Sequence, residues 1–149
     1  YALNEAIKFS PQEVAANNAA SRRSQIVNYA LQFVGNPYVW GGSSPDTSFD
    51  CSGYICWVYT RSGVYHLSRT TAQGIYDQCA IVSREEARPG DLVFFTGTYA
   101  SAGAVSHVGI YVGGSRMLHC GSPIGYADLT SPYWNSHLYA FGRLATIPE

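Results

Sequence analysis

The chain of 149 residues is poor in charged side chains and has no long apolar run. Charged residues make up 13% of it against 46% hydrophobic residues, and the formal net charge is −1. Nucleic-acid backbones are bound by clustered Lys and Arg, so we expect no nucleic-acid partner. Because no run of about eighteen apolar residues is present, we predict no membrane span. What remains is the composition of one folded domain with its own core.

Spacings typical of metal sites are absent as well. The sequence contains no C-x-x-C pair and no H-x-x-x-H pair, so we predict no metal and no cofactor. Four cysteines could form two disulfides, but a catalytic thiol has to stay free, and three thiols cannot all pair. The sequence therefore leaves open the redox state of Cys56, Cys79 and Cys120.

Residues 1–20 differ from the rest of the chain. They are rich in Ala and Asn, and they carry a helix-start pattern in which Ser10 is the cap, Pro11 follows it and Glu13 comes three residues after the cap. We interpret residues 1–20 as a helical linker from an upstream region and residues 21–149 as the domain. Because the chain begins with Tyr1, we expect a fragment or a processed form of a longer protein.

Helical periodicity in the first half gives way to strand periodicity in the second. Helices are predicted at Ser24–Val34, Cys51–Arg61 and, for a short stretch, Thr71–Asp77. Short β-branched and aromatic segments, separated by Gly, Pro and Ser, predict strands at Asp91–Thr96, Ser106–Val112, Ser115–Cys120 and Leu138–Leu144. Helices followed by strands with short reversals indicate an α+β domain, with N-terminal helices packed on a central antiparallel sheet.

Cys51 is the candidate nucleophile, because it stands at the start of the second predicted helix. A thiol attacks as a thiolate, and the unpaired amides of a helix N-terminus favour the thiolate. Asp50 is the expected N-cap, since its carboxylate can accept hydrogen bonds from those amides. Taken alone, Cys51 could equally be an inert buried thiol, so its partners decide. Cys56, five residues further along the same helix, is expected to pack in the core.

His107 is the candidate base, and His119 is the candidate third residue that orients it. His107 begins the apolar segment that runs to Val112, and His119 lies near the end of the next predicted strand. A two-residue turn at Gly113-Gly114 would place the two imidazoles on opposite faces of the sheet. An odd-length turn or a bulge would instead place His119 opposite Gly109, on the same face as His107. We therefore predict the odd-length turn or the bulge, and a neutral His119.

Five segments in order resemble the NlpC-type cell-wall peptidases. The first three are Tyr38-Val39-Trp40-Gly41-Gly42, Phe49-Asp50-Cys51-Ser52-Gly53 and Arg69-Thr70-Thr71-Ala72-Gln73. The other two are Pro89-Gly90-Asp91-Leu92-Val93-Phe94-Phe95 and Ser106-His107-Val108-Gly109-Ile110-Tyr111. The match runs from about Ser21 to Leu144. One departure is Cys120-Gly121 after His119, where the family usually has Ala-Pro or a similar pair.

The resemblance implies a papain-like core in which Cys51, His107 and His119 cleave stem peptides of peptidoglycan. Members of the family commonly cut between γ-linked D-glutamate and the following diamino acid, through a thioester. In some members an Asp and a Ser beside the nucleophile bind the free amine of an N-terminal L-alanine, and a Tyr lies by the reacting carbonyl. The residues of this chain at such motif positions, which we predict to bind substrate, are Tyr38, Trp40, Asp50, Ser52, Arg69 and Ser106.

The same residues leave alternative functions open. A related amidase of the CHAP type, or an acyl transferase, would keep the site and change the bond. A wall-binding module with an inactive triad would keep only the groove. The resemblance further implies an extracellular or cell-wall location, an upstream wall-hydrolase or wall-binding domain, and a monomer. It does not decide between diaminopimelate and lysine, or between tripeptide, tetrapeptide and cross-linked substrates.

Overall fold

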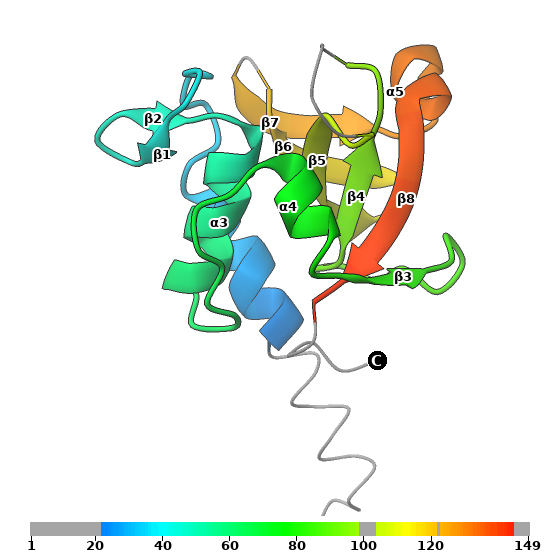
Figure 1. Ribbon diagram of the computed structural model, residues 1–149, viewed down its shortest axis with the longest axis horizontal. Helices are drawn as coiled ribbons and strands as arrows, with labels where there is room; N and C mark the ends of the chain where they lie inside the picture. The colour runs from blue at the N-terminus through cyan, green and yellow to red at the C-terminus, as the bar shows by residue number, and fades with distance from the viewer. Residues whose placement is uncertain (1–21, 99–103, 122, 145–149) are drawn as a thin grey trace, which may run out of the picture.

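The computed structural model describes residues 22–98, 104–121 and 123–144 (Figure 1). The linker predicted at residues 1–20 lies outside the described residues. The N-terminal helices lie on one side of a six-stranded sheet, in agreement with the α+β prediction. Within the described ranges, no helix combines the length and the apolar character needed to cross a bilayer.

The six-stranded sheet has the order β3-β8-β4-β5-β6-β7, and every neighbouring pair is antiparallel. Its strands are β3 (Ala80–Val82), β4 (Leu92–Phe95), β5 (His107–Gly113), β6 (Arg116–Cys120), β7 (Ile124–Asp128) and β8 (Leu138–Arg143). A separate pair, β1 (Ser43–Ser44) and β2 (Ser48–Phe49), lies in the loop before the first catalytic candidate. Four strands were predicted; β3 and β7, which are short or contain glycine, were not.

The helices agree with the predicted positions. A first helix covers residues 22–31, three residues shorter at its end than predicted. It is followed by α3 (Cys51–Arg61) and α4 (Ala72–Tyr76). The helix α5 (Pro132–His137), on the far side of the sheet from α3, was not predicted. Its start pattern, Ser131 followed by Pro132, is present in the sequence, but six residues are too few to show a helical period.

Both faces of the sheet are covered, which follows from the alternation of side chains along a strand. In β4, Leu92 and Phe94 belong to the main core under the helices, whereas Val93 and Phe95 belong to a second cluster on the opposite face. All four are fully buried. The second cluster includes Trp134 of α5, so the unpredicted helix closes the opposite face.

The β5–β6 hairpin contains the irregularity that the catalytic interpretation requires. Its turn residues are Gly114 and Ser115, and the register shifts between Tyr111 and Gly113, so one extra residue lies in β5. Ile110 is opposite Leu118, a register that places Gly109 opposite His119. A Cβ atom on Gly109 would lie 3.1 Å from His119 Cβ. The predicted bulge is therefore confirmed, and it places both histidines on one face of the sheet.

Candidate active site

Helix α3 begins at Cys51, so its sulfur is carried by the first residue of the helix, as predicted. Asp50 is the N-cap: its backbone is extended, and its Oδ1 accepts a hydrogen bond of 2.7 Å from the Gly53 amide. The capping role of Asp50 is confirmed, and it accounts for one of the free amides of the first turn.

Two glycines allow the preceding loop to pack against this first turn. A Cβ atom on Gly53 would lie 2.1 Å from the Gly42 carbonyl oxygen, and one on Gly42 would lie 2.4 Å from the Ser48 carbonyl oxygen. The Asp50 amide donates to the same Gly42 oxygen at 3.1 Å. Backbone meets backbone at this contact, so any larger side chain would push the loop away from Cys51.

Three of the predicted substrate-binding residues form one polar network beside Cys51. Arg69 donates to Asp50 Oδ2 and to Ser52 Oγ, both at 2.8 Å, and Ser52 Oγ donates to Asp50 Oδ1 at 3.2 Å. The Gly41 amide also donates to Asp50 Oδ2, at 3.1 Å. The network is partly exposed, and it places opposite charges next to Cys51 at the N-terminus of α3.

The Cys51 thiol is almost fully buried, with 2% of the residue exposed. Burial, and secondly the charge of Asp50, raise the pKa of the thiol to about 11, against hydrogen bonds from the backbone of Val108 and Ser52 and the charge of Arg69. This corrects one expectation: the helix N-terminus does not outweigh desolvation, so the resting thiol is neutral. The hydrogen bond from Val108 also brings the sulfur to the residue next to His107.

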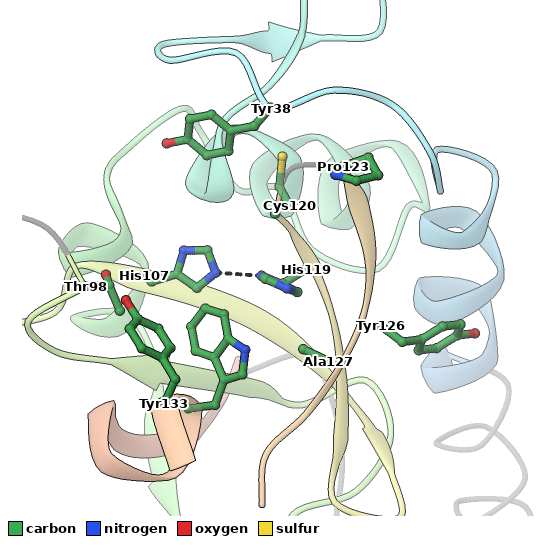
Figure 2. Close-up of a pocket in the computed structure, with 11 residues that line it drawn as sticks. Tyr38, Thr98, His107, His119, Cys120, Pro123, Tyr126, Ala127 and Tyr133 are labelled. Carbon is green, nitrogen blue, oxygen red and sulfur yellow. Dashed lines mark hydrogen bonds between the residues drawn. The ribbon is translucent and has the colours of Figure 1, made fainter. Parts of the chain in front are cut away.

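The two imidazoles are hydrogen-bonded to each other. His107 Nε2 and His119 Nδ1 are 2.9 Å apart, and their ring planes stand at 83° (Figure 2). Because Nε2 of His107 is engaged with His119, Nδ1 is the nitrogen left to exchange a proton with a nucleophile. If Nε2 carries the hydrogen and donates it to His119, Nδ1 of His107 is an acceptor.

Burial also keeps both histidines neutral. It lowers the pKa of His107 to about 3, with a further contribution from His119, and it lowers the pKa of His119 to about 4. The lowered pKa of His119 agrees with the expectation that this residue is neutral. Burial thus shifts the pKa of the Cys51 thiol and of both imidazoles toward their neutral forms.

An open pocket of about 640 Å³ lies over the histidine pair. Figure 2 shows Tyr38 on one side of the pair and Tyr133 on the other. None of the described residues of its lining is acidic or basic apart from the two histidines. The remaining lining residues are Tyr38, Thr98, Cys120, Gly121, Pro123, Tyr126, Ala127, Tyr133 and Trp134.

The other predicted substrate-binding residues have different positions. Tyr38 lines the pocket, as expected of a residue near the reacting carbonyl. Trp40 projects from the same loop and is 72% exposed. Ser106 is buried, and its hydroxyl is 2.5 Å from Thr98 Oγ1 and accepts a hydrogen bond from the Thr98 amide. Ser106 thus holds Thr98 at the pocket, and its contact with substrate stays a prediction.

The cysteines left open by the sequence are all free thiols in the structure. Cys56 is buried in the core, as expected, and Cys79 is half-buried. Cys120, the departure from the family pattern, is buried and donates to the Phe49 carbonyl oxygen at 3.1 Å. It thereby fastens the end of β6 to the segment just before Cys51.

The pocket contains residues that the sequence interpretation missed. Tyr133 and Trp134 belong to α5, and Tyr126 and Ala127 belong to β7, two elements that were not predicted. The motifs end at Tyr111, so nothing in their spacing pointed to this wall.

Across the part of the chain that the structure describes, no cluster of His, Cys, Asp and Glu could hold a metal ion.

The chain matches known proteins over most of its length. The model of the NlpC/P60 family matches residues 35–143. The bifunctional muramidase/DL-endopeptidase CwlT of Bacillus subtilis is 48% identical over 80% of this chain and 36% of its own length. The murein DD-endopeptidase MepH of Escherichia coli is 37% identical over 80% of this chain and 45% of its own. The chain thus spans less than half of either relative.

A solved structure agrees with the fold. The crystal structure of a protein similar to lipoprotein, of the NLP/P60 family, from Staphylococcus aureus superposes with a TM-score of 0.79 at 45% identity. It covers 93% of this chain, which corresponds to 43% of that structure. The helix-capped antiparallel sheet, the ordered motifs and these matches together place this chain in the NlpC/P60 family.

Proposed function

We propose that this domain is a cysteine endopeptidase of peptidoglycan stem peptides, with Cys51, His107 and His119 as its triad. The observation that carries the proposal is the 2.9 Å contact between the imidazoles of His107 and His119, together with the hydrogen bond that the backbone of Val108, the residue after His107, makes to the sulfur of Cys51. The similarity to CwlT and MepH, which are both named as endopeptidases, supports a peptidase. The substrate and a cell-wall location are part of this proposal.

The first step transfers a proton as the sulfur attacks. Both groups are neutral at rest, so Nδ1 of His107 takes the thiol proton while the Cys51 sulfur bonds to the amide carbonyl carbon. His119 accepts the hydrogen bond from His107 Nε2 and so holds the imidazole in the tautomer that leaves Nδ1 free. The Cys51 amide and the Tyr38 hydroxyl are the candidate donors to the tetrahedral oxyanion.

The second step expels the amine. His107 returns its proton to the amine nitrogen, the carbon–nitrogen bond breaks, and a thioester on Cys51 remains. Water, deprotonated by His107, then adds to the thioester carbon and releases the carboxylic acid and the thiol. One imidazole thus acts in both directions, first as the base and then as the acid.

The bond proposed is that between γ-D-glutamate and the diamino acid. The network of Asp50, Ser52 and Arg69 lies beside Cys51 on the helix side, where it can bind the charged end of a short peptide. Asp50 already accepts four hydrogen bonds. A substrate amine would therefore share its carboxylate with Arg69. A free L-alanine amine two residues before the cleaved bond fits this position.

Digestion of purified peptidoglycan, with the released fragments identified by mass, tests the reaction and its bond. We expect new diamino acid amines, with turnover abolished in Cys51→Ala and retained in Cys56→Ala, which removes a thiol from the same helix. Nearly complete loss is expected because a nucleophile and its base act as a unit.

Other outcomes would identify other functions. New N-terminal alanines would indicate the amidase. Cleavage after D-alanine would indicate a DD-endopeptidase, the activity for which MepH is named. Lysis unchanged in Cys51→Ala would contradict the triad. Binding to the wall without any released fragment would indicate the non-catalytic module.

A further inference from the structure

Trp134 of α5 lies against both imidazoles. Its ring is stacked on His107, with centroids 5.3 Å apart and planes at 27°. The same ring meets His119 at 5.0 Å and 79°, an edge-to-face contact. One indole therefore covers both members of the hydrogen-bonded pair, at the wall of the pocket.

The helix α5 is fixed so that it can present this ring. Below Trp134 lies the buried Phe95, at 4.9 Å between centroids. At the end of the helix, the His137 carbonyl accepts from the Thr96 amide at 2.8 Å, and His137 Nδ1 is 2.7 Å from the Thr96 carbonyl. None of the residues of α5 is fully buried, so the short helix contributes little core of its own. The main structural effect of α5 is to hold Trp134 against the two histidines.

A stacked indole does two things to an imidazole. It removes one ring face from water, and it restricts rotation of the ring about its own axis. Phe95 contacts His107 as well, with centroids 5.9 Å apart, and also contacts Trp134, so the three rings form one aromatic cluster. We propose that Trp134 is a positioning residue, which shields the His107–His119 hydrogen bond from water and fixes the plane of His107. The expected effect of Trp134 on catalysis rests on the proposed function. Its expected effect on the titration of the two histidines does not.

Few other groups can influence the titration of the pair. Cys51 reaches the neighbouring residue Val108 from α3. Among the described residues of the pocket, the side chains other than histidine that can ionise are one thiol and three phenols: Cys120, Tyr38, Tyr126 and Tyr133. Exposure to water is therefore the variable that Trp134 controls most directly.

The first test needs no catalysis. Imidazole nitrogen resonances of His107 and His119 are followed by NMR against pH in the inert Cys51→Ala protein, with Trp134, Trp134→Phe or Trp134→Ala. With Trp134 in place, both rings should stay neutral wherever the protein is folded. Removing the cover hydrates the pair, so the midpoints should rise toward 6.5, by at least about one pH unit in Trp134→Ala and by less in Trp134→Phe.

The controls separate positioning from packing. Phe141→Leu perturbs the same apolar cluster but has no ring contact with either histidine among the described pairs, so it should lower stability without moving the midpoints. Unchanged midpoints in both Trp134 variants would overturn the proposal. Should Trp134→Ala fail to fold, Trp134→Phe decides by the same criterion.

The kinetic test uses the active protein. We expect kcat to fall about tenfold in Trp134→Ala with KM within about twofold, and the acid limb of kcat/KM to move to higher pH. A rise in KM alone would mean that Trp134 is only a wall for substrate, and would overturn the proposal. If no variant of the domain cleaves peptidoglycan, the proposed function fails, and the NMR titration still decides the role of Trp134.

Discussion

The proton of Cys51 is the most consequential detail at the scale of single residues. Its thiol stands at a helix N-terminus, which favours a thiolate, but it is buried beside Asp50, which disfavours one. Burial has the larger effect on the pKa of the thiol. A helix terminus contributes at most about 2 kcal/mol, which is about 1.5 pKa units, whereas full desolvation can shift a pKa by about 3–5 units. The domain is thus expected to activate its nucleophile at the moment of attack rather than beforehand.

The alkylation rate of Cys51 tests this state. In the substrate-free protein, the thiolate fraction should grow as pH rises toward the raised pKa of about 11. Reaction with iodoacetamide, followed by mass spectrometry of the peptide that contains Cys51, should therefore be slow at pH 7 and increase steadily up to pH 10. Fast alkylation between pH 5 and 7 that disappears in His107→Ala would instead reveal a preformed thiolate–imidazolium pair.

At the scale of elements, the β5–β6 hairpin sets the relation between the two histidines. Gly109 lies between them: a Cβ atom there would approach Met117 Sδ to 2.7 Å and His119 Cβ to 3.1 Å. The sulfur can move at the end of a flexible side chain, but His119 Cβ is fixed to the backbone of β6. The absence of a side chain at Gly109 therefore lets His119 lean toward His107.

Substitution of this glycine should damage activity more than stability. Gly109→Ala displaces His119, so we expect kcat to fall at least about tenfold, with a loss of about 1–3 kcal/mol in the free energy of unfolding. Gly125→Ala is the matched control, because Gly125 is opposite His119 on β7 and has open space where its Cβ would lie. Equal kcat values for the two variants, measured on the same stem peptide, would rule out this role of Gly109.

Elements also explain what could be predicted from the sequence. Caps and periodicity predicted α3 and four strands, because each depends on residues close together in the chain. The odd-length turn or bulge was predicted because His107 and His119 had to lie on one face of the sheet. β7 and α5 escaped, since Gly125 interrupts the first and the second has only six residues. Trp134 therefore stayed invisible as a neighbour of His107: its contact depends on tertiary packing over 27 residues of sequence, from position 107 to position 134.

At the scale of the whole molecule, one buried carboxylate joins the helical layer to the sheet. Asp91 is fully buried at the start of β4 and accepts hydrogen bonds from Arg23 at 3.0 Å and from Arg143 at 3.0 and 2.8 Å. Arg23 belongs to the helix over residues 22–31, and Arg143 ends β8. Three segments distant in sequence thus meet at one carboxylate, on elements that contribute no residue to the pocket over the histidine pair.

Asp91→Ala should therefore destabilise the fold without altering the chemistry. The change removes the carboxylate shared by the buried Arg23 and the partly buried Arg143, and breaking a buried pair in this way costs about 3–5 kcal/mol. Urea unfolding should show that loss as a lower midpoint with the same slope, whereas kcat and KM at a temperature where the variant is folded should be unchanged. Glu86→Gln, at an exposed carboxylate near Arg143, is the control and should cost well under about 1 kcal/mol. A loss below about 1 kcal/mol in Asp91→Ala would mean that apolar packing alone holds the helices on the sheet.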